Sequence, residues 1–194
     1  MNCLLSFFLS LILLSPIQAN GPESLSAESR LVQEAYLAYT AKPLSEKTQL
    51  NFLRAFPKSG VAFRRIFDEP NFGQLYETSI NYISSLEKLS NRYPKQVLRL
   101  EITLGKNLVW SADAINHLQR ITLTMAIVQP RLFAVEAAKL TPTEQQKLSE
   151  FLTGGAERED LSCSQLVKEL TKIGSVNLAK QLRQAQIRQM RQPE

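Results

Sequence analysis

Apolar residues recur at intervals of three and four positions through most of the chain after residue 24, which is the spacing of one face of an α-helix. Alternation of the strand type is brief and confined to residues 97–102, where a lone strand would have no partner. Helix-forming residues dominate the composition. The pattern predicts an all-α fold, a single irregular multi-helix domain of about eight to ten helices after an N-terminal signal peptide.

Prolines, glycines and capping residues divide this pattern into segments. The frequent proline breaks favour an irregular array over a regular four-helix bundle. The expected helices span roughly residues 26–40, 45–56, 63–67, 74–91, 94–104, 111–129, 131–140, 142–152, 162–173 and 176–190.

The segment from Leu108 to Leu140 has the longest apolar periodicity outside the N-terminal region. It also contains the single tryptophan, Trp110, and the single histidine, His117. Leu123 falls outside its main apolar face, so we expect this helix pair to be covered on more than one side. The segment is therefore predicted to be the packing axis of the domain.

Local signals mark the ends of this axis. Ser111 is the expected N-cap of the first helix, with Asp113 in its first turn. Pro130 is expected to end or kink that helix. The sequence from Thr141 to Glu144 (TPTE) predicts a capping box with proline at the first helical position of the next helix.

The first residues have the pattern of a secretory signal peptide. Leu4 to Leu14 is an uncharged apolar run, Pro16 breaks it, and Ala19 offers a small residue before a cleavage point. The run is shorter than the about 20 residues that a membrane span requires. We expect an exported protein, periplasmic or secreted, cleaved after Ala19. The alternative is an uncleaved N-terminal anchor.

Removal of residues 1–19 would leave a helical domain over residues 20–171 and a basic C-terminal helix or tail over residues 172–194. The remaining cysteine is Cys163, so no intramolecular disulfide is expected. No transmembrane span is expected in the mature chain, because its longest apolar stretches are short or interrupted by charges.

The formal net charge of +5 has a strong C-terminal contribution. Five cations follow Glu169, with Glu194 as the one acid among them, so this helix is a candidate for contact with an anionic surface. A solvated helix end is the simpler alternative. The five cations are Lys172, Lys180, Arg183, Arg188 and Arg191.

Aromatic residues concentrate between positions 52 and 82, interleaved with arginine and lysine. Stacking on bases or sugars would require exposed rings, but the i, i+4 spacing of these residues predicts core packing. A nucleic-acid partner is therefore not expected. Any exposed aromatic or cationic residues would mark a ligand or partner surface, for which the candidates are Arg64, Arg65, Tyr76, Trp110 and His117.

Candidate chemistry is sparse. Cys163 and His117 are the one thiol and the one imidazole that could form a dyad, but no local signature supports it. Acid–base hydrolysis would need two carboxylates about 5 to 9 Å apart. The candidates for that role are Glu101, Asp113, Glu136 and Glu144. Neither a metal-ligand spacing nor a glycine-rich phosphate loop occurs, so no metal and no cofactor are expected.

These observations favour a non-catalytic binding, structural or accessory component of the bacterial cell envelope or secretome. Its partner would be an envelope protein or an anionic surface. One alternative is a small exported hydrolase that uses carboxylates near the central helix pair. The other is binding to an anionic surface through the basic C-terminal helix.

Overall fold

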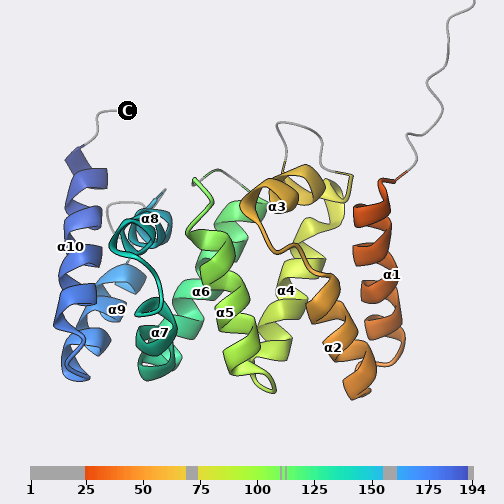
Figure 1. Cartoon of the computed structure of the whole chain (residues 1–194), viewed down its shortest axis with the longest axis horizontal. Helices are drawn as coiled ribbons and strands as arrows, with labels where there is room; N and C mark the ends of the chain where they lie inside the picture. The colour runs from red at the N-terminus through yellow and green to blue at the C-terminus, as the bar shows by residue number, and fades with distance from the viewer. Residues whose placement is uncertain (1–24, 69–73, 110, 112, 155–160, 192–194) are drawn as a thin grey trace, which may run out of the picture.

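The computed structural model describes residues 25–68, 74–109, 111, 113–154 and 161–191. Its helices stand side by side in one elongated array, with α1 at one end and α10 at the other (Figure 1). The helices are α1 (Ala27–Ala41), α2 (Glu46–Ala55), α3 (Gly60–Phe67), the 3-10 turn η2 (Tyr76–Thr78), α4 (Ser79–Ser90), α5 (Pro94–Gly105), α6 (Ala114–Val128), α7 (Pro130–Ala137), α8 (Pro142–Thr153), α9 (Leu161–Lys172) and α10 (Val176–Arg191).

Every regular element of the described residues is helical, which confirms the all-α, single-domain prediction. The short alternating stretch 97–102 lies inside α5. Trp110 and the proposed signal peptide fall outside the described residues. No helix in the described part of the chain has the length and apolarity needed to cross a bilayer.

Serine side chains begin the first three helices. Ser26, Ser45 and Ser59 each accept a hydrogen bond from the backbone N–H three residues further on. Each bond satisfies a donor that the first turn of a helix cannot satisfy itself. The first two boundaries agree with the expected ones, whereas α3 begins at Gly60, three residues before the expected start at 63, because Ser59 acts as its cap.

Phenylalanine rings fill the space that α2 and α3 enclose. Phe52, Phe56, Phe63 and Phe67 are each at most 1% exposed. The Phe52 and Phe56 ring centroids lie 5.8 Å apart, and those of Phe63 and Phe67 lie 5.3 Å apart. Full burial of one such side chain contributes about 1.5 to 3 kcal/mol. The predicted core role is confirmed for these four rings and for Tyr82, whereas Tyr76 is partly exposed and Phe72 lies outside the described residues.

The inward face of α4 differs from the expected one at a single position. Ile80 is 54% exposed, although its place in the apolar pattern suggested burial. Tyr82 and Leu86 are buried and define the inner face. Ile80 precedes Tyr82 by two residues, and residues two apart on a helix do not share a face.

The predicted cap at Ser111 is wrong. The helix α6 begins at Ala114, and its N-cap is Asp113, whose φ angle is 59°. Positive φ is uncommon outside glycine, and aspartate is one of the residues that adopt it more readily. The Ser111 hydroxyl instead donates a hydrogen bond to Asp68 Oδ1 over 3.4 Å. The cap prediction relied on residue type alone and failed because the Ser111 side chain is hydrogen-bonded to Asp68, which is distant in sequence.

The helix α6 occupies the interior of the array and contacts α4, α5, α7, α8 and α9. Its consecutive residues Ile121, Thr122 and Leu123 are all buried, so burial extends around most of the helix and leaves one exposed strip that includes Arg120 and Thr124. Pro130 starts α7 directly after it. The segment 108–140 is therefore the packing axis, as predicted from its apolar pattern.

Both ends of α8 are held by side chains. At its N-terminus, Thr141 Oγ1 accepts from the Glu144 N–H at 3.3 Å and Glu144 Oε2 accepts from the Thr141 N–H at 2.9 Å, which confirms the predicted capping box. At its C-terminus, the side-chain nitrogen of Gln119 donates to the carbonyl oxygens of Phe151 at 2.8 Å and Gly154 at 2.6 Å. A buried amide of α6 therefore satisfies carbonyls that the end of α8 leaves free.

Replacement of Gln119 by leucine should destabilise the fold. Gln119 is 5% exposed, and its loss leaves two carbonyls without their buried donor. We expect a loss of about 2 kcal/mol in the free energy of unfolding, measured by urea denaturation. The matched control is Gln96→Leu on the exposed side of α5, which should change stability by no more than about 0.5 kcal/mol. Equal effects of the two substitutions would contradict this role of Gln119.

Candidate functional site

The cations of α3 are used in contacts between segments. Arg64 donates to the carbonyl oxygen of Val109 at 3.1 Å, and Arg65 forms an ion pair with Glu28 of α1. The Tyr76 hydroxyl donates to Asp113 Oδ2 at 2.5 Å. Arg64 and Tyr76 thus both contact the connection between α5 and α6, whereas Arg65 points to α1.

His117 lies apart from that group, on the side of α6 that faces α4. Its Nε2 atom is 3.0 Å from the Ser84 hydroxyl oxygen. Burial and the nearby Arg120 lower the pKa of His117, while the charge of Glu87 opposes the change. The five candidates from the sequence therefore do not form one surface in the described residues, and Trp110 is not among those residues.

The Ser84–His117 pair lacks the other parts of a nucleophilic site. Ser84 lies inside α4, where backbone N–H groups are engaged in the helix and cannot form an oxyanion hole. Cys163, the other candidate nucleophile, is fully buried in α9. A substrate from solvent cannot reach its thiol in this arrangement.

Two of the four candidate carboxylates are ion-paired. Glu136 accepts from Arg99 at 3.1 Å and Lys139 at 2.5 Å, and these hydrogen bonds lower its pKa. Glu144 accepts from Lys106 at 2.6 Å, which with the capping box lowers the pKa of Glu144 to about 2. Both groups are ionised at neutral pH and stabilise helix contacts.

The remaining two candidate carboxylates, Asp113 and Glu101, have different surroundings. Asp113 accepts from Tyr76 and is exposed at the start of α6. Glu101 is 1% exposed, and neither of its carboxyl oxygens has a hydrogen-bond partner in the described part of the chain. Burial raises the pKa of Glu101 well above its usual range, and the negative charge of Glu87 adds to the rise. Glu101 is thus the candidate carboxylate that the fold does not use for a contact.

Glu101 lines a cavity of about 180 Å³ between α4, α5 and α6, here called the Glu101 pocket. Glu87, Ser90 and Asn91 come from α4 and its C-cap, and Gln129 comes from the end of α6. The other lining residues, all from α6, are Ile121, Thr124, Met125 and Val128. The pocket therefore combines a buried carboxyl, an exposed carboxylate, neutral polar groups and apolar walls.

Two carboxylates on one cavity are the first requirement of a hydrolase that uses acid–base chemistry. The size of the Glu101 pocket argues against a hydrolase site. Sites for small molecules usually enclose about 300 to 1,000 Å³, so a cavity of about 180 Å³ accommodates a group the size of one side chain. The pocket is better suited to bind a small group than to hold both sides of a scissile bond.

Glu87 and Ser84 were missed at the level of sequence. Their positions on α4 carry no motif, and they reach Glu101 and His117 only through the packing of α4 against α5 and α6. The position of Glu101, in contrast, is unusual in the sequence itself. It follows Val97 and Leu98 by four and three residues and precedes Leu104 by three, so an ionisable residue occupies a core position of α5.

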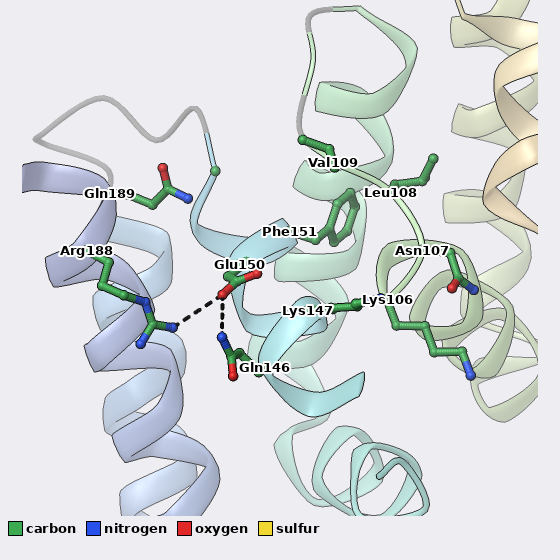
Figure 2. A pocket seen from close by; sticks show the side chains of 11 residues that line it. Lys106, Asn107, Leu108, Val109, Gln146, Lys147, Glu150, Phe151, Arg188 and Gln189 are labelled. Atoms are coloured by element: carbon green, nitrogen blue, oxygen red, sulfur yellow. Dashed lines mark hydrogen bonds and ion pairs between the residues drawn. The ribbon is translucent and has the colours of Figure 1, made fainter. Parts of the chain in front are cut away.

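A larger cavity of about 740 Å³ lies between the end of α5, α8 and α10. Its cations are mostly paired, since Lys106 contacts Glu144 and Arg188 contacts Glu150 at 3.5 Å. Figure 2 shows Arg188 and Gln146 both directed at the Glu150 carboxylate. Although it is larger, this cavity offers less unused chemistry than the Glu101 pocket.

The five C-terminal cations divide into two groups. Lys172 pairs with Glu169 at 2.6 Å and Arg188 pairs with Glu150. The other three, Lys180, Arg183 and Arg191, are exposed and form no ion pair within the described residues. Together with three apolar residues they lie on one side of α10, where successive members are about one helical turn apart. We call this set the α10 outer stripe; its members are Val176, Lys180, Arg183, Ile187, Met190 and Arg191.

Comparison of the chain with protein-family models, curated proteins and solved structures found no match in any of the three. Among the described residues, no group of three or more acidic, histidine or cysteine side chains could hold a metal ion.

Replacement of Glu101 by glutamine should stabilise the protein at neutral pH. A raised pKa means that the folded state binds a proton that the unfolded state has released, so stability falls as the pH rises from about 4.3 towards the folded-state pKa. Each pH unit between the unfolded-state and folded-state pKa values of Glu101 lowers the free energy of unfolding by about 1.4 kcal/mol. Glutamine does not titrate, so the variant does not lose this stability.

Urea denaturation at pH 4 and pH 7.5 measures this effect. The Glu101→Gln variant should gain stability over the wild type at pH 7.5 and much less at pH 4. Glu46→Gln, at an exposed position of α2, serves as the control and should show little change at either pH. An equal difference from the wild type at both pH values would contradict a raised pKa.

Proposed function

We propose that the protein is a non-catalytic binding component of the cell envelope that attaches to an anionic lipid surface through the α10 outer stripe. The observation that carries the proposal is the combination of unpaired cations and exposed apolar side chains on one face of the terminal helix. The stripe belongs to the basic C-terminal helix, whose cations are the expected contact with an anionic surface.

The charge of α10 favours an anionic partner. The helix contains four cationic residues and no acidic one. Lys180, Arg183 and Arg191 are free of the ion pairs that engage Lys172 and Arg188. A lysine or arginine close to an anionic bilayer contributes about 1 kcal/mol of attraction, so three such residues provide about 3 kcal/mol.

The apolar members of the stripe favour lipid over polysaccharide. Val176 is 59% exposed, Ile187 is 38% exposed and Met190 is 47% exposed. Apolar side chains beside cations are typical of helices that lie in the interface of a membrane, where the apolar groups enter the headgroup region. An anionic polysaccharide would use the cations and gain little from these three residues.

The position of α10 supports contact with an extended surface. Ala179, Leu182 and Ala185 form its buried face, which packs on α8 and α9. The helix therefore stands at one end of the array, seen at the left of Figure 1. A rigid helix with one face in the core can present the other face to a planar partner without rearrangement of the domain.

Export is part of the proposal and rests on the apolar run Leu4–Leu14, Pro16 and Ala19. The measurement is the intact mass of the protein recovered from a periplasmic extract or culture medium after expression of the full chain. The mass should correspond to a chain that begins at Asn20. A full-length chain retained with the membrane would instead indicate an uncleaved anchor.

Neutralisation of the stripe should abolish attachment to anionic vesicles. The test variant is Lys180→Gln/Arg183→Gln/Arg191→Gln, and the measurement is co-sedimentation with phosphatidylcholine vesicles that contain phosphatidylglycerol. Loss of about 3 kcal/mol corresponds to an affinity lower by about a hundred-fold. Deletion of the whole helix is a less specific test, because it would also remove Leu182 from the core.

The matched control is Lys47→Gln/Lys88→Gln/Lys95→Gln, which removes three exposed cations from α2, α4 and α5 and changes the net charge equally. It should bind the vesicles like the wild type. Equal losses in the two triple variants would show a general charge effect and contradict the stripe.

Ile187→Ser/Met190→Ser should weaken vesicle binding and leave retention on heparin unchanged. Unchanged vesicle binding of this variant would contradict a lipid surface.

A further inference from the structure

The Glu101 pocket contains a chemical group that the fold leaves without a partner. Both oxygens of the Glu101 carboxyl lack a hydrogen-bond partner among the described residues, and the side chain is 1% exposed. Buried polar atoms are nearly always paired, so an unpaired one in a native structure requires an explanation. The cavity that the group lines supplies one, because a bound ligand could take the place of the missing partner.

The charge of the pocket selects the sign of that ligand. The ionisable residues among its lining are Glu101 and Glu87, and both are acids. Beyond the lining, His117 and Arg120 of α6 interact with each other, and Glu87 interacts with His117. A cation would neutralise Glu101 at the back of the pocket and would also be attracted by Glu87 in its exposed position.

The walls of the pocket distinguish an organic cation from a metal ion. Calcium takes six to eight oxygen ligands at short distance, whereas this cavity has apolar side chains from Ile121, Met125 and Val128 on its α6 side. A ligand with a charged end and an apolar stem would satisfy both kinds of wall. The volume of about 180 Å³ limits that ligand to the size of a single long side chain.

We propose that the Glu101 pocket binds the primary ammonium group of an alkylamine, with the alkyl stem against the apolar residues of α6. An ammonium ion is a compact charge with three donors, which suits one buried carboxylate and the hydroxyls of Ser90 and Thr124. The same chemistry is present in a free alkylamine and in a lysine side chain of a partner protein. On binding, Glu101 releases its proton to solvent and faces the ammonium as a carboxylate.

This site lies on α4, α5 and α6, apart from the α10 outer stripe, so it does not depend on attachment to a membrane. The two proposals are tested by different variants. Failure of the vesicle experiment would leave the Glu101 pocket unaffected, and the reverse also holds.

Isothermal titration of the full chain with n-butylammonium chloride tests the proposal, because this probe has the length and charge of a lysine side chain. We expect saturable binding in the millimolar range, and an affinity lower by about ten-fold or more in Glu101→Gln. The control Glu46→Gln should bind like the wild type. Thermal unfolding of Glu101→Gln checks that the variant is folded, as its greater expected stability predicts.

Two further probes make the result specific. The neutral analogue n-butanol should bind more weakly than n-butylammonium, and calcium chloride should not compete with it. The proposal is overturned if n-butylammonium shows no saturable binding, if n-butanol binds equally well, if calcium displaces the amine, or if Glu101→Gln retains the wild-type affinity.

A second titration with Nα-acetyl-lysine methylamide distinguishes the sources of the ammonium group. Affinity equal to that of n-butylammonium supports a lysine side chain of a partner protein, since the pocket then admits an ammonium that is attached to a peptide backbone. Binding of n-butylammonium without binding of the lysine derivative supports a free alkylamine.

Discussion

The fold depends on the burial of one helix on several sides. The helix α6 contacts five others, and three successive side chains of it, at positions 121–123, are buried. Only a narrow strip of α6, formed by Asn116, Arg120, Thr124 and Val128, is exposed, so a polar residue elsewhere on this helix needs a partner inside the protein. Gln119 meets this condition by binding the carbonyls of Phe151 and Gly154, which joins the centre of the array to the end of α8.

The same condition explains why Glu101 is conspicuous. Gln119 and Glu136 are also buried, yet one caps a helix and the other accepts from two cations. Glu101 has neither kind of partner among the described residues, although desolvation of its carboxyl lowers the stability of the fold at neutral pH. A protein that retains such a group loses stability at that position, and binding of a ligand is a physical reason to do so.

The α10 outer stripe and the Glu101 pocket differ in what they present. The stripe is a cationic and partly apolar face at one end of the array, whereas the pocket is a small acidic cavity between α4, α5 and α6. The charges of the two sites are opposite, so the two proposals involve different kinds of partner, an anionic surface for the stripe and a cationic group for the pocket.

The helices and their ends were largely predictable because they depend on neighbouring residues. Apolar spacing located the helices and the central axis, and the cap residues Ser26, Ser45 and Thr141 located three of their starts. The helical repeat alone places Lys180, Arg183 and Arg191 on one side of a helix, but the sequence did not separate these three from Lys172 and Arg188, which are ion-paired. Ser111 was the exception, because Asp68, far away in the sequence, takes its side chain.

Tertiary structure alone decided which charged groups are neutralised and which are free. The sequence did not show which cation each carboxylate meets: Arg99 pairs with Glu136 and Lys106 pairs with Glu144 through helix packing, whereas Glu101 has no ion pair within the described residues. The proximity of Glu87 to Glu101 and the contact of Ser84 with His117 likewise arise only where α4 meets α5 and α6. Local sequence determines where a helix forms and which way its side chains point, but the partners of those side chains are set by contacts between residues that are distant along the chain.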